Sequence, residues 1–151
     1  VGTIDAFYDA HMDLVSVHPV FNLYNYSWPI NTHHGPYPPA KFVHADTERA
    51  GGATNSVVSP GVVVSGGHVH NSVLSPGVFV HSYSDVIDSV LLDGVDVGRH
   101  AQLHRVIVDK GVRLPAGIRL GHDREQDLAR GLQVTESGIT VVGKGHVFDE
   151  T

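Results

Sequence analysis

The sequence predicts a mainly β fold, a parallel β-helix of about four coils made of hexapeptide repeats, and three observations support this. Glycines recur at intervals of 16, 17 and 17 residues, at Gly61, Gly77, Gly94 and Gly111. Similar segments surround them: NSVVSPGVVV, NSVLSPGVFV, DSVLLDGVDV and RVIVDKGVRL. Within these segments large aliphatic residues follow one another every five or six residues, a period that fits neither an α-helix nor an alternating strand.

Each coil of such a fold takes about 17 or 18 residues and holds three short strands, each paired with its counterpart in the next coil. The spaced aliphatic side chains should point into the prism and stabilise it by roughly 1.5–3 kcal/mol each. A single coil cannot bury its own inner face, so the coils must stack. Hexapeptide coils of this class wind left-handed, against the usual crossover rule, and we expect that hand here. The predicted inner residues are Val58, Val64, Val69, Leu74, Val80, Val86, Leu91, Val97, Leu103, Val108, Leu114 and Leu120.

A helix and an extended connector are expected before the coils. Residues 3–15 place apolar side chains at helical spacing, and Thr3 is suited to cap the first turn. Residues 16–42 are rich in proline and aromatic side chains, which indicates an extended segment lying against a larger surface. Residues 41–44 predict a first strand, and the polar, Gly-rich stretch 46–54 predicts a loop.

After the coils, residues 123–130 predict a short polar helix that ends at Gly131, and residues 139–142 predict a last strand. The chain therefore divides into three parts. Residues 1–42 form the helix and connector, residues 43–121 the β-helix, and residues 122–151 a short helix, a strand and a tail.

Composition argues against several kinds of site. Sixteen acidic and ten basic residues give a net charge of −6, so we expect no nucleic-acid partner. The absence of cysteine excludes disulfides, cysteine-ligated zinc and thiol nucleophiles. No apolar run approaches the length of a membrane span and no signal peptide is visible, so we expect a cytoplasmic protein without a membrane partner.

The order of segments is more specific than the repeat. Val1-Gly2-Thr3 opens the helix, Trp28-Pro29-Ile30 follows in the connector, and Pro38-Pro39-Ala40-Lys41-Phe42-Val43 leads into the coils. In this order the whole chain resembles the C-terminal third of bacterial ADP-glucose pyrophosphorylases, also called glucose-1-phosphate adenylyltransferases. The resemblance continues through Val97-Gly98-Arg99, Val108-Asp109-Lys110 and Glu136-Ser137-Gly138-Ile139.

The resemblance implies a part of an enzyme rather than a catalyst. The family makes ADP-glucose and pyrophosphate from ATP and glucose-1-phosphate with Mg²⁺, for glycogen biosynthesis, in a nucleotide-binding domain that precedes this segment. No Gly-rich nucleotide loop occurs here, and the family's metal-binding Asp would come immediately before Val1. We therefore expect ATP and Mg²⁺ in the parent enzyme, no cofactor in this chain, and no catalysis by this chain alone.

The resemblance also implies a candidate effector site. In the family this domain contributes contacts of a dimer or tetramer and part of a site for an anionic sugar phosphate or pyruvate, which cations would bind. Lys110 and Lys144 match basic positions near the effector, and the turn from Ser59 to Gly61 matches one implicated in regulation. Pro60 removes a backbone N–H from that turn. On composition alone, both lysines would be solvated surface charges.

Other interpretations stay open. Twelve histidines suggest a metal site, but we expect no two histidines to stack in neighbouring coils, and hence no metal site within one chain. A hexapeptide-repeat acyltransferase with one histidine as base is an alternative, although the longer coil array and protruding loop of that class are not visible. A purely structural oligomerisation module is the other.

Overall fold

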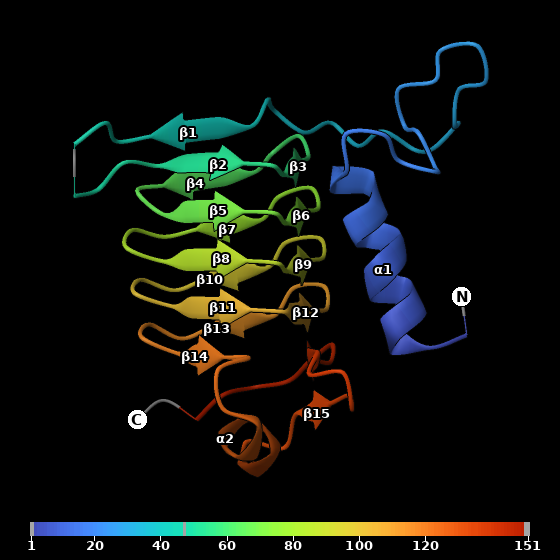
Figure 1. Cartoon of the computed structure of the whole chain (residues 1–151). Helices are drawn as coiled ribbons and strands as arrows, with labels where there is room; N and C mark the ends of the chain where they lie inside the picture. The colour runs from blue at the N-terminus through green and yellow to red at the C-terminus, as the bar shows by residue number, and fades with distance from the viewer. Residues whose placement is uncertain (1, 47, 150–151) are drawn as a thin grey trace.

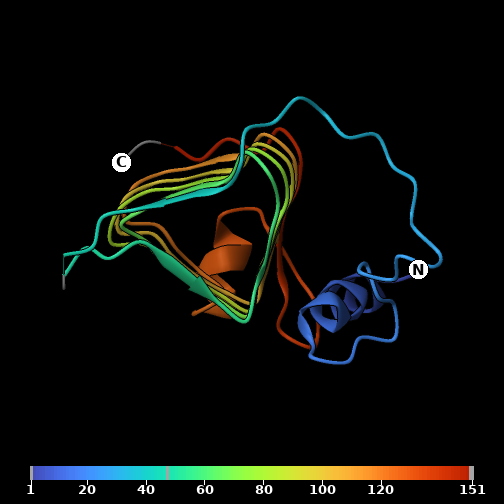
Figure 2. The ribbon, with the colours of Figure 1, turned by 90° about the horizontal axis from the view of Figure 1, so that it is seen from above.

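A computed structural model describes residues 2–46 and 48–149, which form a triangular prism of three sheets with a helix beside it (Figures 1 and 2). Sheet A contains, in spatial order, β1 (Lys41–Val43), β4 (Val63–Ser65), β7 (Phe79–Val80), β10 (Asp96–Val97) and β13 (Arg113–Leu114). Sheet B contains β14 (Arg119–Leu120), β11 (Gln102–His104), β8 (Asp85–Ile87), β5 (His68–His70) and β2 (Gly52–Thr54). Sheet C contains β15 (Gln133–Val134), β16 (Thr140–Val142), β12 (Val106–Val108), β9 (Val90–Leu91), β6 (Val73–Leu74) and β3 (Val57–Val58).

The coils stack in register, as the repeat predicts. Along sheet A the parallel pairings place Val64, Val80, Val97 and Leu114 one above another, each no more than 1% exposed. Every predicted inner aliphatic residue belongs to this core, and only Val58, in the outermost coil, is partly exposed. The mainly parallel β-solenoid of about four coils is therefore confirmed, while its hand stays a prediction.

Three columns of left-handed residues mark the three corners of the prism. At each corner one residue per coil has a positive φ, a conformation that glycine adopts without strain. The corner between sheets C and A uses glycine in four successive coils: Gly61, Gly77, Gly94 and Gly111. The B/C corner uses Asn55, Asn71, Asp88 and Arg105. The A/B corner uses Gly66, Tyr83, His100 and Gly117.

Buried serines connect successive coils at the B/C corner. The hydroxyl of Ser72 accepts a hydrogen bond from the backbone N–H of Ser89 at 3.1 Å, and the hydroxyl of Ser89 accepts one from Val106 at 3.2 Å. Both serines are fully buried, and each donates to the carbonyl oxygen two residues before it. These bonds satisfy polar groups that the sharp turn would otherwise leave unpaired.

Helix α1 (Ile4–Val15) begins after the predicted cap, since the Thr3 hydroxyl accepts from the N–H of Ala6 at 3.1 Å. It lies along sheet C (Figure 1), where Tyr8 joins an apolar cluster with Val73, Val90 and Ile107. At 12 residues it is the longer described helix, and no described helix has the length and apolar character needed to cross a membrane.

The N-terminal connector contains no regular secondary structure, whereas the predicted loop 46–54 ends in a strand. Residues 16–40 contain no strand or helix and expose aromatic side chains, with Tyr26 88% and Trp28 82% exposed. The loop prediction is wrong at its end, because residues 52–54 form β2. There, pairing of Gly52–Thr54 with His68–His70 outweighs the low strand propensity of glycine.

Below the coils the chain makes helix α2 (Arg124–Ala129), capped by Asp123, and strand β16, both close to the predicted elements, and also the strand β15, which was not predicted. The Asp127 carboxylate is 1% exposed and accepts from the Gly121 N–H and the Thr140 hydroxyl, both at 2.8 Å. It thus fastens α2 to the end of β14 and to β16. The proposed three-part division stays a prediction, although β1 already belongs to sheet A.

Candidate functional site

The candidate effector residues all lie on the C/A corner. Turns of successive coils stack there directly, because the N–H of Gly77 donates to the Pro60 carbonyl and the N–H of Gly111 donates to the Asp93 carbonyl at 2.9 Å. This edge of the prism is therefore a continuous column of turns. The column brings Lys110 and Lys144 together but holds Ser59 and Gly61 apart from them.

Lys110 and Lys144 occupy the same turn position in consecutive coils. Strand β16 pairs with β12 so that Val108 faces Val142, and each lysine follows two residues later. Both lysines are exposed, and no described carboxylate lies within ion-pairing distance of either ammonium group. The Asp109 carboxylate instead accepts from the backbone N–H of Lys110 at 2.7 Å. Two ammonium groups on adjacent turns can approach one anion.

Two shallow cavities flank this pair. One, of about 490 Å³, lies between the start of α1 and the corner and is lined by Thr3, Phe7, Asp109 and Gly143. The other, of about 400 Å³, is lined by Lys144 itself and by Gln133. Lys144 thus stands at one open depression, and Lys110 directly follows Asp109, which lines the other, a setting that suits a small, solvated anion.

Ser59 and Gly61 lie at the other end of the column. Three coil steps of about 4.8 Å place the Gly61 turn roughly 14 Å from the Gly111 turn. The Gly61 N–H already donates to the Pro38 carbonyl at 2.6 Å, and the Tyr37 ring lies against this glycine. A ligand the size of a sugar phosphate that binds this turn would displace the connector and could not sit between the two lysines.

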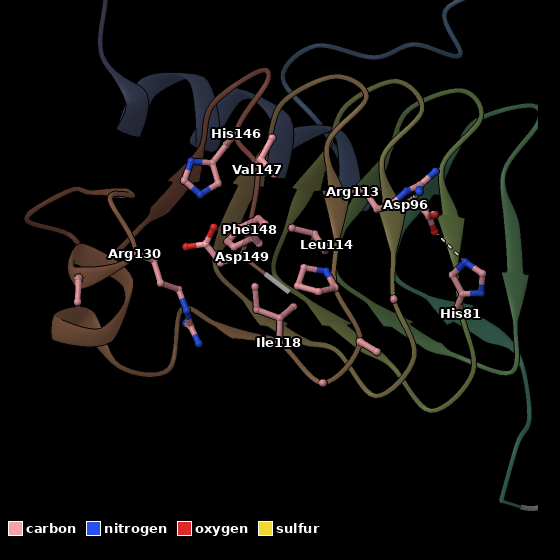
Figure 3. Close-up of a pocket in the computed structure, with 15 residues that line it drawn as sticks. His81, Asp96, Arg113, Leu114, Ile118, Arg130, His146, Val147, Phe148 and Asp149 are labelled. Carbon is pink, nitrogen blue, oxygen red and sulfur yellow. Dashed lines mark hydrogen bonds and ion pairs between the residues drawn. The ribbon is translucent and has the colours of Figure 1, made fainter. Parts of the chain in front are cut away.

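A larger cavity, of about 870 Å³, lies on the outer side of sheet A and was not predicted (Figure 3). At one side His81 Nε2 lies 2.8 Å from Asp96 Oδ1, and Arg113 Nε lies 3.7 Å from Asp96 Oδ2. Leu114 and Phe148 give it an apolar side. His81 and Asp96 lie on neighbouring coils, so the 17-residue register could have revealed the pair.

The tail continues the solenoid register, which the sequence analysis missed. Residues 142–148 read VGKGHVF beside VDKGVRL at 108–114, and Gly145 follows Gly111 by 34 residues, twice the repeat. The His146 N–H donates to the Gly143 carbonyl, the turn bond of the other coils, and Phe148 packs on the core. No backbone hydrogen bond between described residues joins this tail to β13, where Pro115 offers no N–H.

The register agrees with the prediction that no two histidines stack in neighbouring coils, since Leu103 pairs with Leu120 and His122 therefore lies one residue beyond the position opposite His104. The rings of His104 and His122 nevertheless approach each other, with centroids 6.1 Å apart and planes tilted by 32°. Partial burial, and next Arg119 and His104, lower the pKa of His122. Among residues 2–46 and 48–149 no three His, Asp or Glu side chains are placed to hold a metal ion.

Comparisons with known proteins agree with the fold. The family model described as GlmU-like, C-terminal hexapeptide matches residues 38–142. A glucose-1-phosphate adenylyltransferase of Bifidobacterium adolescentis is 60% identical over 150 residues, which cover 99% of this chain and 36% of that protein. Proteins of the same name from Arthrobacter sp. and Deinococcus radiodurans are 56% and 53% identical, with 32% and 36% of their lengths covered. The chain thus spans about a third of the length of these curated relatives.

Proposed function

The chain belongs to the family of GlmU-like C-terminal hexapeptide domains, and from this premise we propose that it is the C-terminal regulatory and oligomerisation domain of a glucose-1-phosphate adenylyltransferase. The observation that carries the proposal is 60% identity to such an enzyme over 99% of the chain. The chain's own part in that protein is to bind an effector and to associate, in the cytoplasm. The conversion of ATP and glucose-1-phosphate, with Mg²⁺, belongs to residues outside this chain.

The effector site is the Lys110–Lys144 pair. Two exposed ammonium groups without a described carboxylate partner, at equivalent turns of consecutive coils, favour a phosphate or carboxylate ligand. Lysine acts as a point charge and lacks the fork of arginine, so the pair suits a monoanionic or dianionic group without strict orientation. Ser59 and Gly61 form a second candidate contact, which requires Tyr37 and Pro38 to move.

Calorimetry with fructose-6-phosphate, fructose-1,6-bisphosphate, glucose-6-phosphate and pyruvate tests this assignment. Lys110→Ala and Lys144→Ala should each weaken the binding of the active effector by about ten- to a hundredfold, as expected for loss of one charge-assisted contact of about 1.5–3 kcal/mol. Lys41→Ala, an exposed lysine on β1, is the matched control and should bind normally. Unchanged affinity in both test variants would sink the assignment.

Self-association is the second part of the proposal, since hexapeptide solenoid domains commonly form oligomers. The outermost strands β1, β2 and β3 end their sheets, and unpaired strand edges favour association. The exposed aromatic side chains of the connector, such as Trp28 and Tyr26, add apolar surface. Sedimentation velocity should find a dimer or tetramer, and a strictly monomeric chain at all concentrations contradicts this part.

One observation favours acyl transfer as a second candidate. His81 is held by Asp96 at 2.8 Å beside the 870 Å³ cavity, an arrangement that orients an imidazole as a general base. Titration with coenzyme A tests it. Binding that is lost in His81→Asn would support a hexapeptide acyltransferase, and absence of binding would exclude it.

A further inference from the structure

The A/B corner holds a cluster of cationic and aromatic side chains that the effector site does not use. The Tyr83 ring stacks on the His100 ring, with centroids 4.9 Å apart and planes 13° apart, and the Arg99 guanidinium lies 5.5 Å from the Tyr83 centroid. From the preceding loop, Arg49 Nε donates to the hydroxyl of the buried Ser82 at 3.0 Å. No described carboxylate pairs with Arg49 or Arg99.

Tyr83 adopts a strained backbone conformation although its side chain is only partly buried. Its φ is +63°, in the left-handed region that strains bulky residues, whereas Gly66 and Gly117 occupy the same corner position without strain. Arg105 at the B/C corner is equally unusual, but it lies over the Tyr8 ring and donates to the Ser137 carbonyl. Tyr83 remains 41% exposed, so its strain is not offset by burial.

The shape of the corner favours a macromolecular partner. It is a vertex of the prism (Figure 2), and the side chains of Arg49, Tyr83 and Arg99 line none of the cavities described above. The 870 Å³ cavity reaches the same corner only in the lower coils, at Gly98 and Gly117. Small molecules bind in concave sites, whereas exposed tyrosine and arginine are typical of protein interfaces. Two guanidinium groups without a described carboxylate partner select for an acidic surface.

A second copy of the chain offers such a surface at its opposite side. None of the ten lysines and arginines lies in residues 1–40, and α1 carries Asp5, Asp9 and Asp13 at spacings of four residues along one stripe. Asp9 is exposed. Viewed along the prism, α1 lies beyond sheet C, across from the A/B corner (Figure 2). On one molecule the cationic corner and the acidic stripe of α1 therefore lie on opposite sides. On two neighbouring molecules the corner of one can meet the stripe of the other.

We propose that the A/B corner of one copy, through Tyr83, Arg49 and Arg99, docks on the acidic stripe of α1 of a second copy. The contact joins two different surfaces, so it extends head to tail beyond a dimer. This proposal deepens the self-association put forward above and rests on it. Association through the strand edges at the coil ends is a separate contact.

Sedimentation velocity over a concentration series, in low and high salt, tests the contact on the full chain. The wild-type chain should associate, and salt should weaken the association. Arg99→Glu and Asp9→Arg should each raise the concentration at half-association about tenfold or more. Arg119→Glu makes the same charge change on sheet B and should leave association unchanged. An equimolar mixture of the Arg99→Glu and Asp9→Arg chains should associate again, because each restores the complement of the other.

Tyr83→Gly separates a docking role from a structural one. It removes the left-handed strain, so the melting temperature should stay equal or rise while association weakens. Wild-type association in Arg99→Glu, Asp9→Arg and Tyr83→Gly would overturn the proposal and leave self-association itself intact. A wild-type chain that never associates would overturn both. Failure of the mixture to associate when each variant alone has lost association would also overturn the head-to-tail contact.

Discussion

The hydroxyl of Tyr8 donates a hydrogen bond of 2.5 Å to the main-chain carbonyl of Asp88, eighty residues further along the chain. This bond fastens α1 to the B/C corner, where the Arg105 guanidinium lies 5.3 Å from the Tyr8 centroid. The Ser137 hydroxyl donates a further hydrogen bond to the carboxylate of Asp5 in the first turn of the helix. The position of α1, and of the connector that follows it, therefore depends on the solenoid corner.

Tyr8→Phe should lower the free energy of unfolding by about 1 kcal/mol, because it removes one hydrogen bond and leaves the ring in place. Tyr8→Ala should lower it by about 3–5 kcal/mol, since it also removes a buried ring. Urea unfolding followed by circular dichroism measures both. Tyr24→Phe, in the exposed connector, is the control, and an equal loss there would refute the assigned anchor.

Alkaline pH should release the same anchor. Burial raises the pKa of Tyr8, an effect that the positive charge of Arg105 opposes in part. The folded state thus holds the phenol proton more tightly than the unfolded state. Its contribution to stability is present below pH 10 and is lost as the pH rises through the folded-state pKa. Stability measured from pH 8 to 11 should fall less steeply in Tyr8→Phe than in the wild type.

His122 should titrate below an ordinary histidine. Its lowered pKa arises first from burial and next from the positive charge of Arg119, with His104 contributing less. Arg119→Gln should therefore raise this pKa more than His104→Gln, and His68→Gln should leave it unchanged; NMR titration of the imidazole protons measures all three. Because the folded state disfavours the proton, the stability contribution is present above about pH 6.5 and is lost as the pH falls.

Asp127→Ala should destabilise the C-terminal cap by about 2–4 kcal/mol, because the N–H of Gly121 and the hydroxyl of Thr140 would lose their acceptor inside the protein. Asp123→Ala, four residues earlier at the start of the same helix, removes only the N-cap and should cost about 1 kcal/mol. Thermal unfolding compares the two. Equal losses would mean that the buried carboxylate adds nothing beyond helix capping.

Gly121→Ala and Gly94→Ala form a matched pair of glycine substitutions. Both glycines have a positive φ, +78° and +70°, so each alanine is strained by about 1 kcal/mol. A Cβ at Gly121 would also overlap the carbonyl oxygen of His104, whereas a Cβ at Gly94 meets open space. Gly121→Ala should therefore be clearly the more destabilising in chemical denaturation, and similar losses would contradict the close approach.

The solenoid was predictable because its core repeats. Val80, Val97 and Leu114 face inward in coil after coil, and a fixed spacing is visible in one sequence. Strand β2 was not predictable from Gly52 and Ala53, because its partner His68–His70 supplies the pairing. Local propensity does not report such a partner.

The candidate site was predictable only in part, for the same reason. Lys110 and Lys144 were found by resemblance, but their proximity depends on β16 returning to sheet C after α2. The insertion of α2 interrupts the 17-residue period. The spacing alone therefore does not show that residues 142–148 return to the register of the coils. The approach of the His104 and His122 rings was missed because the two residues are 18 apart, one more than the 17-residue register of that coil.

Because of Pro115, the two ends of sheet A differ in their capacity to pair with a further strand. At the lower end of sheet A this proline withholds the N–H that a following parallel strand would need, and Phe148 closes the core beneath it. At the upper end β1, β2 and β3 keep free edges. Sheet A therefore has one end, at β13, that resists the addition of a further strand and one end, at β1, that permits it.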